Sequence, residues 1–374
     1  MADGIQLQLM IGPAVPVPVP RDVIDALRTV RVTTSTDGAS IFQLGFELNR
    51  KSPLHTIFLV AGGATPPLVR VIITVTVKGQ THVLIDGVMT NHEVTGGGKG
   101  QNPLLTITGE DLTRVMDYID FSGIPYPAMP DFARVLVILA KYAVFGIIPM
   151  VLPSVLIDVP LPIERIPIHR GKDLEYVKKL ADRVGYVFYH EPGPVPGISR
   201  AYWGPEIKVG KPQPALNVDM DAHTNVESMS FTYDSEKATL PVIVIYLKEA
   251  HTVIPIPVPP ITPLSPPLGL IPPIPKKIEW ITETAKYNPM QAAGIGLAKA
   301  AKTAEVVTAR GSLNVLRYGV LKARELVGVR GAGMAFDGLY YVRSVTHNIQ
   351  RGEYTQEFEL SRNGLISTLA TVPA

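Results

Sequence analysis

The chain has 374 residues, of which 46% are hydrophobic and 18% are charged, and its formal net charge is +2. This length and composition are typical of a folded protein with two or three domains and exclude a disordered chain. The near-neutral charge argues against nucleic acid or an anionic membrane as the main partner, because both require a concentrated basic surface. The absence of cysteine excludes disulfides, thiolate metal sites and a cysteine nucleophile.

The N-terminus has neither a basic segment nor a long apolar segment, so we expect no secretion signal. The apolar stretch 132–159 resembles a membrane span, but Arg134 and Lys141 interrupt it. Pro149 and Pro153 would also break a continuous helix. We therefore predict a buried helix followed by extended chain, without direct insertion into a membrane.

The first part of the chain, 1–114, has the pattern of β-strands, with β-branched residues and partial alternation of apolar and polar residues. We predict that it forms an N-terminal β-barrel domain. The expected strands cover 41–48, 69–77, 82–89 and 104–108, with a glycine-rich hairpin tip at 96–100.

The pattern changes to mixed α/β over 115–215, which we predict to be a middle domain. Apolar residues recur there at helical spacing, and Gly146 and Gly185 are placed to end two of the helices. The expected elements are helices at 111–119, 132–145 and 173–184, followed by a strand at 186–189.

Strands resume in 216–374, which we predict to be a second β-barrel. The segment 253–275 is so rich in proline that we expect an extended polyproline loop, either a stiff spacer or a strap that docks on a neighbouring subunit. The other expected elements are strands at 242–246, 339–349 and 353–360, and a helical insertion over 287–326 with helices at 287–303 and 312–326.

Two segments share a spaced pattern. Asp86-Gly87 and Asp337-Gly338 each precede a histidine, a second strand and a polar corner that ends at Leu112 or Leu365. This pattern predicts an internal duplication with one similar barrel near each end of the chain. The pattern is short, and chance similarity is the alternative.

No motif meets the requirements of a catalytic or nucleotide site. The segment 96–100 lacks the Ser or Thr that follows the lysine of a phosphate loop. The segment 293–296 lacks the third glycine of a dinucleotide fingerprint, and 197–201 ends in Ala where a nucleophile elbow has Gly. We predict no catalytic, cofactor-binding or metal-binding residues, and no cofactor.

The histidines form no closely spaced ligand pair. For His92, His190 and His347 we expect structural or surface roles. Trp203 could stack on a sugar, although an anchor in the core is the more ordinary role of a tryptophan.

Several segments together resemble the phage late-control D proteins. The resemblance extends over roughly 110–370, and its motifs are specific only in combination. The segments are 173–189, 191–194, 202–205, 326–333, 336–349 and 351–364. The family includes the baseplate hub of contractile phages and the N-terminal part of the type VI spike protein VgrG.

The resemblance implies an α+β, mainly β fold with two similar antiparallel tube-like barrels per chain and an intervening α/β region. It implies a structural homotrimer, not an enzyme, that couples a sixfold inner tube to a threefold spike. The implied partners are a spike trimer, inner tube or tube-initiator proteins and baseplate wedge proteins. The resemblance also implies assembly in the bacterial cytoplasm, followed by incorporation into a phage-tail-like particle that can be released outside the cell. Because the sequence ends at Ala374 without a spike domain, we expect the spike to be a separate polypeptide.

Two other functions stay open at this stage: a tail-associated cell-wall hydrolase and a carbohydrate-binding tail module. The C-terminal region has a local excess of arginine that could line a channel, face an acidic spike collar or lie on a solvated surface. These residues are Arg324, Arg330, Arg343 and Arg351.

Overall fold

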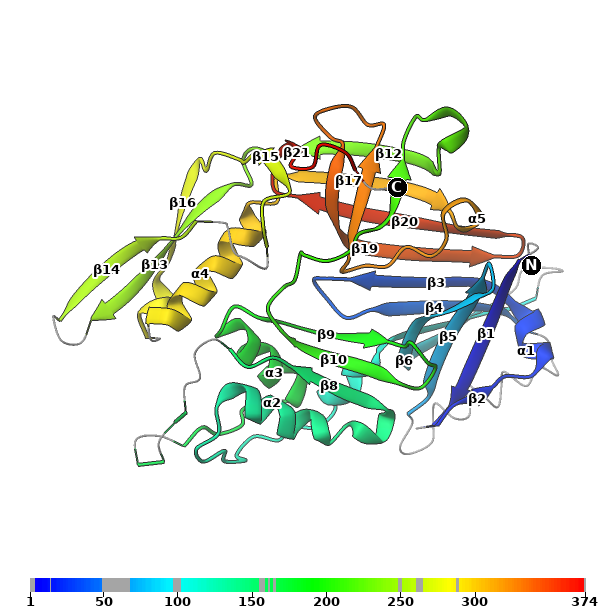
Figure 1. The fold of residues 1–374 in the computed structure, drawn as a ribbon. Helices are drawn as coiled ribbons and strands as arrows, with labels where there is room; N and C mark the ends of the chain where they lie inside the picture. The colour runs from blue at the N-terminus through cyan, green and yellow to red at the C-terminus, as the bar shows by residue number, and fades with distance from the viewer. Residues whose placement is uncertain are drawn as a thin grey trace.

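The structure of the chain is a computed structural model. It describes residues 4–13, 15–48, 68–96, 102–154, 159–160, 162–163, 166–247, 251–259, 265–286 and 289–372. As predicted, the fold is mainly β, and most of its strand pairs are antiparallel. Figure 1 shows a large sheet at the top and right, a middle region below it, and a small sheet with one helix that projects at the upper left.

Strands before residue 112 form what we call the first unit. Its β-branched strand β5 is buried along almost its whole length and pairs with β1 on one side and β6 on the other. The elements of this unit are β1 (Ile5–Gly12), β2 (Val17–Pro18), α1 (Arg21–Ala26), β3 (Leu27–Ser35), β4 (Ile41–Glu47), β5 (Arg70–Val77), β6 (Gln80–Thr95) and β7 (Leu104–Asp111). The predicted hairpin tip falls partly on 97–101, outside the described residues.

Strands near the C-terminus form the second unit. The hairpin predicted over 339–360 is confirmed: its two strands pair in antiparallel register from Tyr341–Ser361 to Gln350–Glu353. The elements are β11 (Gln213–Asn217), η5 (Asp221–His223), β12 (Val226–Tyr233), β17 (Val307–Asn314), α5 (Val315–Tyr318), β18 (Leu326–Arg330), β19 (Gly338–Gln350), β20 (Glu353–Arg362) and β21 (Leu365–Ser367).

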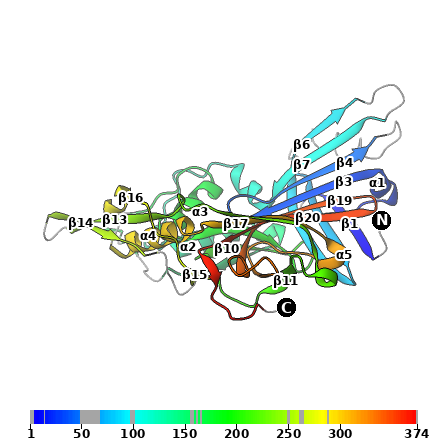
Figure 2. The same cartoon turned by 90° about the horizontal axis from the view of Figure 1, so that it is seen from above.

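The two units share one 13-stranded sheet because β3 of the first unit pairs with β19 of the second. We call this pairing the seam. Figure 2 shows the sheet running without a break from β6 through β3 and β19 to β17. The described strands do not close into a barrel, which differs from the two separate barrels that were predicted. The physical reason is that β3, the edge strand of the first unit, pairs with the part of β19 that lies beyond its pairing with β18, so the two sheets join each other and neither meets itself.

The two units have the same strand order. The first follows β3-β4-β7-β6-β5-β1 and the second β12-β17-β20-β19-β18-β11, which are matching positions along the chain. Two of their register irregularities also match. The register shifts at Arg28 in β3 and at Glu227 in β12, and again at Thr90 in β6 and at Arg343 in β19. Bulges are specific features of a strand pair, so their repetition supports the predicted duplication.

One pair of strands differs in direction: β1 lies antiparallel to β5, whereas β11 lies parallel to β18. The two units therefore differ in the direction of the outer strand, whereas the four central strands have the same order and matching registers.

The middle region contains a three-stranded sheet, β8-β10-β9, packed against two helices. The predicted helix 111–119 is instead a 3₁₀ helix, whose start Asp111 caps by accepting a hydrogen bond from Thr113 N. The elements are η3 (Leu112–Asp117), α2 (Asp131–Ala140), η4 (Ala143–Phe145), β8 (Ile147–Val151), α3 (Asp173–Asp182), β9 (Val187–Pro192) and β10 (Ser199–Gly204). Over the described ranges, the helices are all too short or too polar to cross a membrane.

Between β12 and β17 the chain leaves the large sheet and forms what we call the arm. In the arm, α4 packs on the three-stranded sheet β14-β13-β16, and its Gly296 lies against Ile243 and Val258. The elements are β13 (Thr239–Leu247), β14 (Thr252–Pro257), β16 (Lys277–Ile281), η6 (Thr282–Lys286) and α4 (Pro289–Thr303). The helix predicted at 287–303 is therefore confirmed over its described part.

The prediction of a polyproline loop over 253–275 is wrong for its first part. Residues 253–257 belong to β14, an edge strand that pairs with β13, and Gly269–Ile271 forms β15, which pairs with β21. Pro255 and Pro257 occupy alternate positions, so both rings can lie on the outer edge, where no ladder hydrogen bond is lost. Residues 260–264 lie outside the described part.

The prediction of a helix over 312–326 is also wrong. Residues 312–314 end strand β17, which pairs with β20, and only Val315–Tyr318 are helical before Gly319 turns the chain at φ +115°. Long-range pairing with β20 overrides the local helical spacing of the apolar residues.

Candidate assembly site

The large sheet ends in an open edge at β12. Among the described strands, β12 pairs only with β17, and most of its residues are exposed. An unpaired strand presents a row of backbone donors and acceptors that another strand can satisfy.

A second open edge lies on β6. Residues 80–88 pair with β5, and from residue 91 onward the strand pairs only with β7, on its other side. The segment 90–95 is mostly exposed, which fits an edge that no described strand covers.

The seam shows how two such edges fit together. Strand β19 first pairs with β18 up to Tyr341, passes the bulge at Arg343, and then pairs with β3 from Ser344 to Gln350. The matching strand β6 pairs with β5 up to Val88, passes the bulge at Thr90, and is then open. The open edge of β6 thus corresponds to the part of β19 that pairs with β3. In the same way, the open edge of β12 corresponds to the edge of β3 that pairs with β19.

The matching bulges also fix a register. At the seam, Thr33 pairs with Thr346, and their Oγ1 atoms lie 2.9 Å apart. Counting from the bulges, Thr232 of β12 corresponds to Thr33, and Glu93 of β6 corresponds to Thr346. A join between β12 and β6 of two chains would therefore bring Thr232 opposite Glu93.

One face of the sheet is mostly polar across both units, with Ile41 and Leu104 as exposed apolar exceptions, and the other face is mostly buried. The polar face contains hydroxyl, amide and charged side chains on the same side as Thr33, as the pairing registers require. The opposite face carries buried residues such as Val32, Leu44 and Phe358. Representative polar residues, one from each strand, are Glu93, Thr108, Gln43, Thr33, Thr346, Glu357, Ser312 and Ser228.

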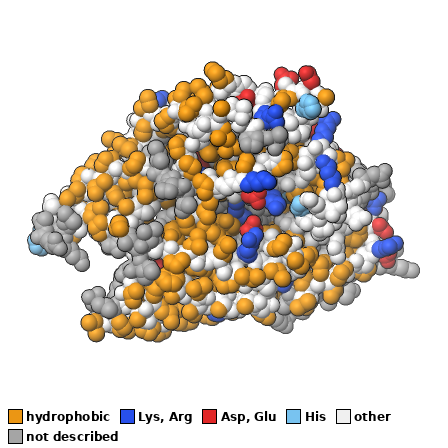
Figure 3. Space-filling view, viewed as in Figure 1, with side chains coloured by type: hydrophobic (Ala, Val, Ile, Leu, Met, Phe, Trp, Pro, Cys, Tyr) orange, Lys and Arg blue, Asp and Glu red, His pale blue; other side chains and the backbone are white. Residues whose placement is uncertain are grey.

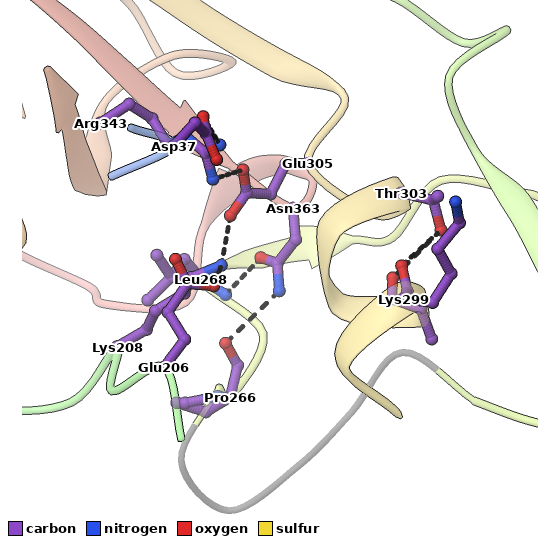
Figure 4. Close-up of polar contacts among 11 residues, drawn as sticks. Asp37, Glu206, Lys208, Pro266, Leu268, Lys299, Thr303, Glu305, Arg343 and Asn363 are labelled. Carbon is purple, nitrogen blue, oxygen red and sulfur yellow. Dashed lines mark hydrogen bonds and ion pairs between the residues drawn. The ribbon is translucent and has the colours of Figure 1, made fainter. Parts of the chain in front are cut away.

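A charged cluster, shown in Figure 4, connects four parts of the chain. Arg343 of β19 contacts Glu305 at 3.0 Å and also pairs with Asp37, which follows β3. Lys208, in the segment after β10, pairs with Glu305 and lies 3.0 Å from Glu206. We call these five residues the junction. It connects the two units, the segment that leaves the middle region and the end of the arm.

Most of the junction is buried, and its charges compensate one another. The side chains of Lys208 and Glu305 are each 5% exposed. Burial alone would lower the pKa of Lys208, but the carboxylates of Glu305 and Glu206 outweigh this effect and raise it. The pKa of Arg343 is raised in the same way by Glu305 and Asp37. Both cations are therefore held in the charged form, and the junction fixes the orientation of the parts that it connects.

Ser199 and Trp203 belong to β10 and His190 belongs to the paired strand β9, whereas His92 and His347 lie in the large sheet. Ser199 is completely buried in β10, and Trp203 is an interior anchor whose Nε1 donates to Val177 O at 3.4 Å. His190 and His347 are buried, whereas His92 is partly exposed on β6. Within the described ranges, no group of three His, Asp or Glu side chains could hold a metal ion.

The four arginines have different surroundings, and Arg330 lies at the end of β18, where it pairs with Asn217 of β11. Arg343 belongs to the junction, and Arg324 lies 4.3 Å from the ring centroid of Tyr189 and donates to Ser35 O at 2.6 Å. Arg351 donates to Asp25 O, in α1. Sequence reasoning did not find the junction, because most of its members are distant in sequence and only the folded chain, including the seam, brings them together.

Neither a protein-family model nor a curated protein matches the sequence. Among solved structures, the chain is similar to a tail protein from Neisseria meningitidis MC58, with 13% identity, 97% and 98% of the two chains covered and a TM-score of 0.64. It is also similar to the 43 kDa tail protein of prophage MuSo2 from Shewanella oneidensis, with 13% identity, 96% and 98% coverage and a TM-score of 0.60.

A third similar structure is the c3393 protein of E. coli, described as a component of the type VI secretion system. It has 12% identity, and the alignment covers 93% of this chain and 76% of that one with a TM-score of 0.54. The chain therefore has the fold seen in phage tail proteins and in a type VI secretion component.

Proposed function

We propose that this protein is the structural hub of a phage-tail-like particle or contractile injection system. Three copies form a ring, and each copy contributes two similar tube-like units, so that six equivalent units face a sixfold inner tube. A separate threefold spike binds the other side. The proposed domains are 1–114, 115–215 and 216–374, as predicted from the sequence. In this proposal the protein has a structural role without catalysis and is assembled in the cytoplasm.

The observation that carries this proposal is the repeated unit with complementary open edges. The seam pairs β3 with β19 inside the chain, and the corresponding edges, on β12 and on residues 91–95 of β6, have no partner among the described strands. Repeating the seam between chains would join β12 of one copy to β6 of the next. Contacts of this head-to-tail kind form a ring when the rotation closes.

The polar face supports the same assembly. A ring of joined sheets has an inner and an outer face, and the face that carries Thr33 and Thr346 has the polar composition of a surface in contact with water. The buried opposite face packs against the two cores. We propose that the polar face lines a central channel that continues the inner tube, and that wedge proteins contact the periphery.

A disulfide trap tests the ring directly, because the chain has no native cysteine. The variant carrying Glu93→Cys and Thr232→Cys should form covalent oligomers under mild oxidation, with a closed trimer of three 40.5 kDa chains as the limit. Thr33→Cys with Thr346→Cys, across the seam, serves as the positive control and should cross-link within one chain. Val94→Cys with Thr232→Cys is the matched negative control, since Val94 points to the other face.

The products are read by denaturing electrophoresis and native mass spectrometry, with the purified spike and tube proteins added in parallel. A covalent trimer that forms with the cysteine pair at 93 and 232, and not with the pair at 94 and 232, supports the proposed ring. Monomers throughout, or equal cross-linking in the shifted pair, would contradict the proposed join.

A further inference from the structure

The arm presents an apolar sheet face that its own helix does not cover. Helix α4 covers the side of the sheet that carries Ile243, Ile245 and Ile281. The registers place Ile278 and Trp280 on the opposite side, where they are 62% and 58% exposed. Figure 3 shows hydrophobic side chains gathered over the projecting arm. Exposed apolar surface of this kind marks a contact site for another protein.

The root of the arm, where the chain leaves β12, lies beside the open edge of that strand. By the same count from the bulges, Glu236 corresponds to Asp37, which reaches Arg343 across the seam. Glu236 pairs instead with Lys276 and Lys277 at the start of β16. A join between two chains would therefore lack an ion pair equivalent to Asp37–Arg343, because Glu236 is already paired with the lysines at the root of the arm.

The correspondence between the two units also indicates which residue of the next copy would lie opposite the root of the arm. At the seam, Thr36 at the end of β3 and Leu326 at the start of β18 line one pocket. Leu326 corresponds to Arg70, because each is the first paired residue of the strand beside the bulge. The root of one arm would therefore lie close to Arg70 of the next copy.

Arg70 adjoins an exposed apolar patch of the middle region. Its NH2 donates to Gly197 O at 3.2 Å, and Gly197 packs against Gly146. Three side chains next to these glycines, those of Val144, Ile148 and Ile198, are each more than 40% exposed. We call them the 144–198 patch.

We propose that the arm docks on a second copy of this chain, with Ile278 and Trp280 covering the neighbour's 144–198 patch. The inference rests on the proposed ring, since the joined edges bring the two surfaces together. Docking of the arm would also enlarge the interface between the two copies. Pairing the short segment 91–95 covers only a narrow strip, whereas a permanent oligomer needs on the order of 2,000 Å² or more of buried surface. Two apolar faces beside the join provide the additional contact.

Photo-crosslinking tests the contact. p-Benzoylphenylalanine is placed at Ile278 in protein that also carries Glu93→Cys and Thr232→Cys, so that ring formation is read in the same sample. Mixing ¹⁴N- and ¹⁵N-labelled protein separates links between chains from links within one. We expect mixed-isotope peptides that connect position 278 to residues 142–150 or 195–200. The same probe at Met334, which is 78% exposed on the loop before β19, should give none.

The two failures are distinguishable. If the disulfide trimer forms and position 278 gives no link to the patch, the docking inference is wrong and the ring stands. If neither the disulfide trimer nor the link forms, the ring fails and the docking inference fails with it. A link from position 278 to a spike or tube protein instead of a second copy also overturns the inference.

Discussion

Thr33 and Thr346, distant in sequence, hold their hydroxyl oxygens 2.9 Å apart across the seam. This contact lies where two similar units become one sheet. A cross-strand Thr–Thr pair contributes about 0.2–1 kcal/mol relative to alanines. The free energy that keeps the units together must therefore come mainly from the backbone pairing, the shared apolar core and the junction.

Glu305 is the residue on which the junction depends most, because it contacts both Lys208 and Arg343 while almost fully buried. Glu305→Gln should lower the free energy of unfolding by about 3 kcal/mol, since it leaves two buried cations with fewer partners. Urea unfolding followed by fluorescence measures the change. Added salt should not reproduce the effect, because buried pairs are screened only weakly.

Glu175→Gln provides the matched control. Glu175 forms an exposed pair with Lys179 on α3, at 2.7 Å, and its loss should change stability by at most about 0.5 kcal/mol. Equal effects of the two substitutions would show that the junction contributes no more than a surface ion pair.

The sequence revealed strands whose own pattern is strong, such as the alternation of β20 and the β-branched run of β5. It failed where a distant partner decides the structure. Residues 312–314 have helical spacing but pair with β20, and Val253–Pro257 is rich in proline but completes the edge of the arm. The duplicated pattern identified the right hairpins, β6–β7 and β19–β20. The sequence pattern aligns Asp86 with Asp337. This alignment differs in register from the one that follows from the matching bulges at Thr90 and Arg343.

The junction could not be predicted for the same reason. Its residues come from the turn after β3, the segment after β10, the end of the arm and β19, and no local spacing connects them. Only the pairing of β3 with β19 places Asp37 beside Arg343. Sequence patterns report local periodicity, whereas this site is a product of topology.

We predict that His347 makes the stability of the fold at the seam sensitive to acid. It is buried in β19 opposite Val32 of β3, and its Nδ1 lies 2.9 Å from Tyr354 OH. Burial lowers its pKa from 6.5 to about 3, with a smaller contribution from nearby His82. Between pH 6.5 and pH 3, His347 is protonated in the unfolded chain and neutral in the folded chain. The free energy of unfolding is therefore highest above pH 6.5 and decreases as the pH falls toward 3.

The expected slope from this residue is about 1.4 kcal/mol per pH unit inside that window. Urea unfolding at pH values from 7 to 4 measures it, and His347→Gln should flatten the dependence. His223→Gln, at an exposed position in η5, controls for the simple loss of a histidine. An unchanged slope in the His347 variant would assign the acid sensitivity to other groups.

Gly185 holds the arm against the middle region. It ends α3 at φ +71°, and a Cβ at this position would lie 2.3 Å from Gly294 O and 3.1 Å from Ala298 Cβ, both in α4. Gly185→Ala must therefore push α4 away in addition to straining its own backbone. We expect a loss of about 2–3 kcal/mol and faster hydrogen exchange in 289–303.

Gly352→Ala separates the two effects. Gly352 has φ +85° at the tip of the β19–β20 hairpin, and no atom lies within 4 Å of the position that its Cβ would take. This variant should lose only the backbone contribution of about 1 kcal/mol and leave exchange in α4 unchanged. If both variants behave alike, close packing at Gly294 is not what fixes the arm. If only Gly185→Ala loosens α4, the orientation of the arm depends on that contact, and cross-linking from Ile278 should decrease in the same variant.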